Sequence, residues 1–156
     1  MRDKRGFTLI EIMVVLIIIG TAATFAVLSF GDFGKSKQAK SAAEQMVQYI
    51  SLLQQKAILE NRLLGITIHP NGYQAKKYIP SKGWQTINNS RVYQEQPLPN
   101  GLQFQLSKSM NESVNIVIQT SGDITPFDIY IADTNKKKMI QVHGKANGGL
   151  SIHAQS

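Results

Sequence analysis

The stretch Lys4-Arg5-Gly6-Phe7-Thr8-Leu9-Ile10-Glu11 decides how the rest of the chain is interpreted. It leads into an apolar run over residues 7–30, in which Glu11 is the one charged side chain. As a helix this run would be about 36 Å long, and the hydrocarbon core of a bilayer is about 30 Å thick. The sequence therefore predicts a transmembrane helix over residues 7–30 that carries a carboxylate near its start.

The charges around this run predict its orientation. Arg2, Lys4 and Arg5 precede it, and the next cation is Lys35. Cations gather on the cytoplasmic flank of a membrane helix, so the N-terminus is expected in the cytoplasm. The remaining residues would form a domain on the far side of the membrane of this single-pass protein, and in a bacterium that side of the inner membrane is the periplasm. The chain has no cysteine, so this domain must be stable without disulfides.

Residues 31–64 are predicted to continue the helix into the soluble domain. Gly31 and Gly34 suggest a bend at residues 31–34, and Gly65 is expected to end the helix. Apolar residues recur at helical spacing and form one stripe. The stripe comprises Ala39, Ala43, Met46, Ile50, Leu53, Ala57 and Leu64.

Residues 65–156 show the alternation of apolar and polar residues that is typical of short strands. Six or seven strands are expected, the first two joined by a Pro70-Asn71-Gly72 turn with positive φ at the glycine. Residues 97–101, with two prolines, are predicted to be a loop, and the glycine-rich residues 144–149 a mobile tail. A helix followed by antiparallel strands gives an α+β fold.

The leader resembles a known family signature. Lys4 to Glu11 followed by an apolar helix is similar to the class III leader of type IV pilins and type II secretion pseudopilins. The resemblance implies that residues 1–6 are a leader peptide, cut after Gly6 by a prepilin peptidase that then methylates Phe7. It also implies that Glu11 takes part in assembly, by pairing with the Phe7 amine of a neighbouring subunit.

Four further motifs make the chain resemble the minor pseudopilin H family of type II secretion. They are residues 27–30, residues 55–62, Gly83-Trp84-Gln85 with residues 98–102, and residues 121–127 (SGDITPF). The resemblance implies a pilin-like fold, a long helix packed on two antiparallel sheets. It also implies a structural role near the tip of a periplasmic pseudopilus that drives export of folded proteins. The implied partners are the pseudopilins I, J and K, the major pseudopilin G, the prepilin peptidase and the inner-membrane assembly platform.

Other residues give weaker signals. No nucleophile elbow, phosphate loop or metal-ligand spacing is present, so we expect no catalytic residue, cofactor or metal. Trp84 is interpreted as a core residue, with a subunit contact as the alternative. Surface or loop roles are expected for His69, His143, His153, Asp123, Asp128, Asp133, Lys136, Lys137 and Lys138.

Two alternatives remain open at this point. The net charge of +7 and the same leader also suit a type IV pilus minor pilin of the FimT/FimU kind that takes up DNA. The DNA-binding members of that group resemble one another in a tail with two arginines, and Gly144-Lys145-Ala146-Asn147 lacks both. Nucleic-acid binding is therefore not expected. A membrane-tethered enzyme has no motif in its favour.

Overall fold

The structure, a computed structural model, describes residues 8–87, 90–107 and 114–155, with the side chains of residues 26–33 outside this description. The chain forms two compact units, residues 1–34 and 35–156. One long helix, α1 (Leu9–Glu60), begins in the first unit and ends in the second. Its backbone is helical through residues 31–34, where a bend is predicted.

The end of α1 lies earlier than predicted. The helix ends at Glu60, and Asn61 adopts a left-handed conformation with φ of 48°. Its N–H donates to the Ile58 carbonyl oxygen, and the Arg62 N–H donates to that of Ala57. This pair of bonds is a Schellman cap, in which asparagine takes the place usually held by glycine. Gly65, the predicted stop, lies in the first strand instead.

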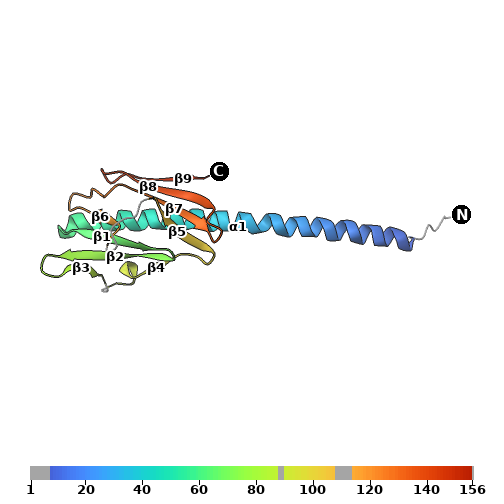
Figure 1. The fold of residues 1–156 in the computed structure, drawn as a ribbon, viewed down its shortest axis with the longest axis horizontal. Coiled ribbons are helices and arrows are strands. Elements are labelled where there is room, and N and C mark those ends of the chain that lie inside the picture. Colours follow the sequence, from blue (N-terminus) through green and yellow to red (C-terminus); the bar gives the residue numbers. More distant parts are fainter. Residues whose placement is uncertain (1–7, 88–89, 108–113, 156) are drawn as a thin grey trace. The chain divides into compact units, whose positions relative to one another are not determined.

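The predicted apolar stripe of the second half of α1 is confirmed. Its residues from Ala39 to Ala57 are buried, and Ala42 and Tyr49 extend it. They form one core with residues of both sheets, and this part of α1 runs alongside both sheets in Figure 1. Leu64 is buried as well, but as part of a strand. Burial of this face, rather than helix propensity, is the main source of the helix's stability.

Two antiparallel sheets follow the helix, as predicted. The first has the order β3-β2-β1-β6, with β4 also pairing with β2, and the second has the order β5-β7-β8-β9. A short 3-10 helix, Arg91–Tyr93, connects β3 to β4. The strands of the first sheet are β1 (Leu64–His69), β2 (Gly72–Ile79), β3 (Gly83–Thr86), β4 (Gln96–Pro97) and β6 (Ile116–Ile118). Those of the second are β5 (Leu102–Leu106), β7 (Phe127–Asp133), β8 (Lys138–Gly144) and β9 (Leu150–Ala154).

Strand β4 is the main element that the sequence did not predict. It pairs Gln96 and Pro97 with Tyr73 and Gly72 at the edge of the sheet, where a proline is tolerated because no ladder bond is lost on its open side. The pairing of β4 with β2 explains why residue 72 is a glycine. The positive φ predicted for Gly72 is wrong. A Cβ on Gly72 would lie 2.7 Å from the Gln96 carbonyl oxygen, so glycine is needed there for close strand approach.

The glycine-rich residues 144–149 are a hairpin turn rather than a free tail. Gly144 is buried in β8, and the Lys145 N–H donates to the Gly149 carbonyl oxygen at 2.8 Å. Gly148 has φ of 83°, a conformation that glycine adopts without strain. The turn therefore joins β8 to β9.

Candidate assembly site

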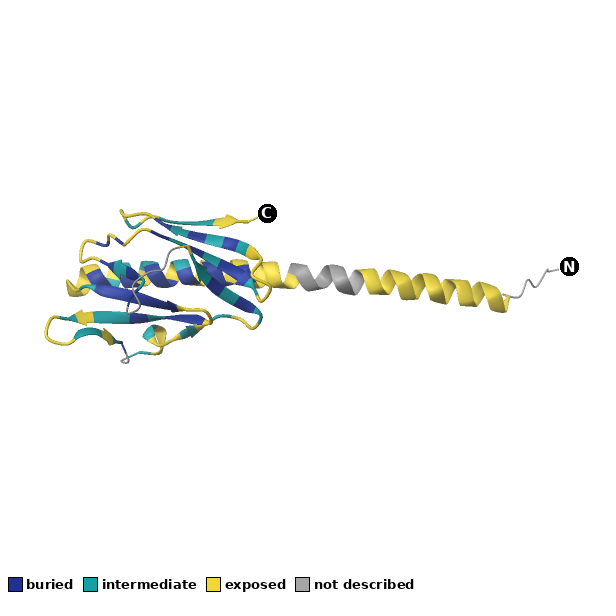
Figure 2. Cartoon of the chain, in the orientation of Figure 1, coloured by how far each residue is buried: buried dark blue, intermediate teal, exposed yellow. Residues whose placement is uncertain are grey.

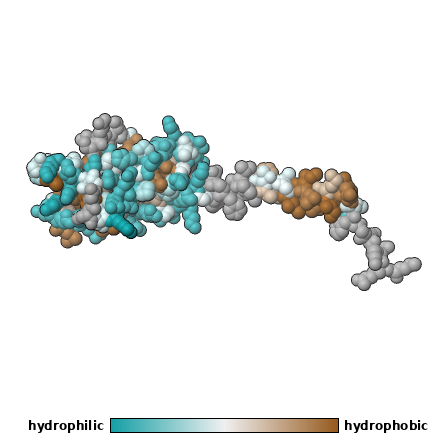
Figure 3. All heavy atoms as spheres, turned by 90° about the horizontal axis from the view of Figure 1, so that it is seen from below, coloured by the Kyte–Doolittle hydropathy of each residue, from teal (hydrophilic) through white to brown (hydrophobic). Residues whose placement is uncertain are grey.

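The described part of the first unit is an apolar helix without a polar face. Its large apolar side chains are exposed throughout, from 44% at Val15 to 78% at Leu9. Figure 2 shows this segment in yellow, and Figure 3 shows apolar residues gathered on it while the second unit is mostly hydrophilic. A helix that is apolar on all sides requires an apolar environment or a partner. The exposed apolar side chains of this segment therefore require a membrane or another protein around them.

Glu11 lies in the first turn of this helix and is exposed. The Thr8 carbonyl oxygen accepts the N–H groups of Glu11 at 3.1 Å and Ile12 at 3.3 Å, which closes the first turn. A carboxylate here is favoured by the positive end of the helix dipole. Within residues 8–87, 90–107 and 114–155 it makes no ion pair. Gly6 and Phe7, the predicted processing residues, lie outside the described residues.

No helix in the described part of the chain is both long and apolar enough to span a membrane.

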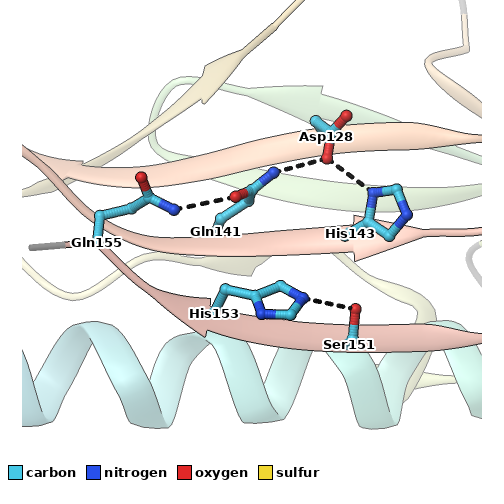
Figure 4. A network of polar contacts seen from close by, with 6 residues as sticks. All are labelled: Asp128, Gln141, His143, Ser151, His153 and Gln155. Carbon is cyan, nitrogen blue, oxygen red and sulfur yellow. Dashed lines mark hydrogen bonds and ion pairs between the residues drawn. The ribbon is translucent and has the colours of Figure 1, made fainter.

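The second unit carries a polar network on the outer face of its second sheet (Figure 4). The Gln141 amide donates to Asp128 at 2.8 Å, and His143 Nδ1 lies 2.8 Å from the same carboxylate oxygen. The hydrogen bonds from His143 and then Gln141 hold the pKa of Asp128 below its usual range. Gln155 extends the row by donating to Gln141 at 2.9 Å. Polar side chains on adjacent strands of a solvated sheet face commonly form hydrogen bonds of this kind, so the network needs no ligand to explain it.

The three predicted aspartates do not come together. Asp128 belongs to the network above, Asp123 accepts a hydrogen bond from Ser121, and Asp133 accepts the N–H groups of residues 135 and 137 in the β7–β8 turn. Among the described residues, no three His, Asp or Glu side chains gather as a metal site requires. His69 is exposed at the end of β1, and His153 bonds with Ser151.

The structure shows where the lysine run and Trp84 lie and what they contact. Lys136 and Lys137 are exposed in the β7–β8 turn, and the Lys138 ammonium lies 3.8 Å from the centre of the Tyr130 ring. Trp84 is half-buried and packs edge-on against Tyr78, with ring centres 5.4 Å apart. Trp84 lies on the outer face of the first sheet and is absent from the hydrophobic core, so the predicted core role is wrong. The alternative, a contact with another subunit, stays a prediction.

Sequence reasoning missed two grooves at the C-terminal end of α1. One, of about 570 Å³, is lined by residues from three separate segments, 61–63, 78–80 and 120. The other, of about 370 Å³, is lined by Lys56, Glu60, Arg62, Leu64, Lys77 and Ile87. No local pattern signals such a groove, because strand pairing brings its walls together.

The leader, the exposed apolar helix and the two antiparallel sheets together define a pilin-like subunit. A model of the prokaryotic N-terminal methylation motif matches residues 1–27. A second family model, type II transport protein GspH, matches residues 42–148. The chain therefore belongs to the GspH family of type II transport proteins.

Individual relatives agree with this assignment. The chain is 32% identical to type II secretion system protein H of Pseudomonas aeruginosa, over 85% of this chain and 86% of the relative. It is 31% identical to the protein H of Vibrio cholerae, over 99% and 96%. The solved structure of the Vibrio cholerae minor pseudopilin EpsH covers 75% of this chain and 97% of its own, with a TM-score of 0.64 and 26% identity. The solution structure of Escherichia coli GspH, at 15% identity, supports the fold alone, with a TM-score of 0.67 over 77% of this chain and 90% of its own.

These comparisons confirm two predictions, the α+β pilin-like fold and the identity as a minor pseudopilin of type II secretion. None of them favours a type IV pilus minor pilin. The Vibrio cholerae relative of known structure is a minor pseudopilin, and the methylation motif implies assembly with other pseudopilins and processing by a prepilin peptidase.

Proposed function

We propose that this minor pseudopilin is a subunit at or near the tip of a short periplasmic filament. Residues 7–30 anchor it in the bacterial inner membrane before assembly, with the N-terminus in the cytoplasm and residues 31–156 in the periplasm. Its neighbours are the pseudopilins I, J and K and the major pseudopilin G. The inner-membrane platform extends the filament, and that movement helps to export folded proteins across the outer membrane.

The observation that carries this proposal is the isolation of Glu11 on an apolar helix. Its carboxylate lies among exposed apolar side chains and makes no ion pair in the described part of the chain. An acidic residue in the centre of a membrane helix costs about 2.5–3.5 kcal/mol on insertion scales, and less near the edge. Glu11 lies near the edge, in the first turn of α1, so its cost in lipid is smaller, but it still favours any state in which a positive partner reaches the carboxylate.

The positive partner of Glu11 is the α-amine that cleavage of the leader exposes on Phe7. The prepilin peptidase cuts after Gly6 and methylates Phe7, so each processed chain begins with a cationic amine one helical turn before Glu11. When helices pack side by side in the filament, the Phe7 amine of one subunit meets the Glu11 carboxylate of another. The pairing relieves the cost of the buried carboxylate and sets the axial register between subunits.

The test is to replace Glu11→Gln in the full chain and return it to a strain that lacks the native copy. We expect normal removal of residues 1–6, measured by mass spectrometry of the N-terminus, because the cleavage site is intact. Cross-linking to other pseudopilins and secretion of the exported protein should both fall sharply. Glu44→Gln, an exposed glutamate on the soluble half of α1, is the matched control. Wild-type cross-linking and secretion by Glu11→Gln would refute the pairing.

A further inference from the structure

The groove of about 570 Å³ lies where the C-terminal end of α1 meets the first sheet. We call it the helix-end groove and define it by Asn61, Arg62, Leu63, Tyr78, Ile79 and Pro80. The start of β1 follows Leu63, and β2 ends at Ile79. Thr120, two residues after β6, completes the opposite wall. The groove is therefore assembled by pairing of β1 with both β2 and β6.

The walls of this groove are already formed, and most of their area comes from the apolar residues Leu63, Ile79 and Pro80 and the Tyr78 ring. Leu63 and Ile79 are half-buried and Tyr78 is 39% exposed. The edge-on contact with Trp84 holds the Tyr78 ring in position. The last turn of α1 leads into the groove and leaves Leu59 85% exposed. A pre-ordered apolar groove bordered by exposed apolar side chains is characteristic of a surface that binds another protein segment.

The border of the groove is positively charged. Arg62 lines both this groove and the adjoining one of about 370 Å³, which also contains Lys77. The other two charges there, Lys56 and Glu60, form an ion pair with each other. Arg62 and Lys77 make no ion pair within the described ranges of the chain. Arg62 in the helix-end groove and Lys77 in the adjoining one complement a segment that carries both carboxylates and apolar side chains.

The charge also argues against two other occupants. A second copy of this chain, related by a two-fold axis at the groove, would bring Arg62 and Lys77 toward their own equivalents. The net charge of the processed chain, +5 from 14 Lys and Arg against 9 Asp and Glu once residues 1–6 are removed, adds to that repulsion. A nucleic acid would use the cations, but it would leave the aliphatic walls formed by Leu63, Ile79 and Pro80 without an apolar partner.

We propose that the helix-end groove binds an acidic, amphipathic segment of another pseudopilin. Apolar side chains of that segment enter the groove, and its carboxylates pair with Arg62 and Lys77. This proposal rests on the proposed function, because it takes its partner from the same filament. It assigns the soluble unit its own subunit contact, separate from the pairing of Glu11 with Phe7.

The first experiment uses a photo-reactive residue in the full chain, expressed in the host that contains the secretion system. We place it at Thr120, on the wall of the groove, and at Thr134 in the β7–β8 turn as the control. Peptides cross-linked after irradiation are identified by mass spectrometry. We expect Thr120 alone to yield a peptide from another pseudopilin, with at least two Asp or Glu residues among apolar ones. A peptide from a second copy, a nucleic-acid adduct, a peptide without acidic residues or no adduct would overturn the proposal.

The second experiment tests the charges. Reversal of Arg62 and Lys77 to Glu should lower the Thr120 cross-link about tenfold, because like charges now face each other. The same reversal at Lys136 and Lys137, which are exposed in the β7–β8 turn, should leave it unchanged. Replacement of Arg62 and Lys77 by Gln should give an intermediate loss, and fluorescence of the single tryptophan checks that these variants fold. An unchanged cross-link in the folded variants would overturn the proposal.

Secretion in the same strains separates this proposal from the function on which it rests. If deletion of the chain leaves secretion intact, the proposed function fails. If the full chain supports secretion but the cross-link at Thr120 is absent, only the assignment of the groove fails.

Discussion

The side-chain amide of Gln54 donates to the carbonyl oxygen of Gly148 at 3.0 Å, across 94 residues of sequence. The same nitrogen donates to the carbonyl oxygen of Gly122 at 2.9 Å. One side chain of α1 therefore donates hydrogen bonds to a backbone carbonyl oxygen in each of two turns, the turn before β7 and the turn between β8 and β9. Close packing requires glycine here, since a Cβ on Gly148 would lie 2.8 Å from the backbone carbonyl oxygen of Gly122.

Gln54→Ala is expected to lower the free energy of unfolding by about 1–2 kcal/mol, because two part-buried carbonyl oxygens lose their donor. The neighbouring Gln55→Ala is the control, since Gln55 is exposed. Urea denaturation of the detergent-solubilised full chain, followed by circular dichroism, gives both values. Equal midpoints for the two variants would show that the bonds add no stability.

Gly65→Ala should destabilise the first sheet by about 1–3 kcal/mol, the usual cost of overpacking. A Cβ there would lie 2.6 Å from Val114 Cγ1 and 2.9 Å from Trp84 Cζ3. In Gly34→Ala the new methyl group meets nothing within 4 Å, so this helical site should gain up to about 1 kcal/mol. Denaturation followed by fluorescence of Trp84, the single tryptophan, distinguishes the two.

The same contact can be tested by a double-mutant cycle. Trp84→Leu removes the ring that opposes the new methyl group, so the combined cost of Gly65→Ala and Trp84→Leu should be less than the sum of the single costs. Circular dichroism measures unfolding in the absence of the tryptophan. Strict additivity would mean that Val114 alone causes the strain.

The sequence predicted those features that periodic burial imposes. The stripe from Ala39 to Ala57 faces the core because apolar residues recur at helical spacing, and the strands alternate because one face of each sheet is buried. The isolated carboxylate at Glu11 was also visible, since one charge in an apolar run needs no structure to be noticed.

The features that were missed depend on contacts between distant segments. Gly65 looked like a helix stop, because glycine has no local signal that separates a stop from a site of close packing. Asn61 supplied the left-handed cap instead. Strand β4 has only two residues, too few for any alternation. The helix-end groove exists only after β1 has paired with β2 and β6.

Alkaline pH should lower stability through the buried aromatic cluster. Burial raises the pKa of Tyr73 to about 12, above the value of about 10 in an unfolded chain. Between these values the unfolded state releases the proton first, so the free energy of unfolding falls as pH rises, by up to about 1.4 kcal/mol per unit for one group. Urea denaturation between pH 8 and pH 12 should therefore show a shallower decline in Tyr73→Phe. Tyr130→Phe, on the outer face of β7, is the control, and identical slopes in all three proteins would contradict this explanation.

Tyr49, the neighbour of Tyr73 in this cluster, has a buried hydroxyl group whose contribution to stability can be tested separately from that of its ring. Its ring packs edge-on against Tyr73 at 5.0 Å. Its hydroxyl oxygen meets the geometry of a hydrogen bond with no group in the described part of the chain. Burial, the largest effect on this group, raises its pKa, and the Ala75 backbone interacts with the hydroxyl group only enough to offset part of that effect.

Tyr49→Phe keeps the ring and removes an unpaired polar group, so stability at neutral pH should be unchanged or higher by about 1 kcal/mol. Tyr49→Ala, which also removes the ring, should cost about 3–5 kcal/mol. Denaturation midpoints of the two variants separate the contribution of the ring from that of the hydroxyl group. A loss of stability in Tyr49→Phe close to that in Tyr49→Ala would show that the hydroxyl group has a partner in solution.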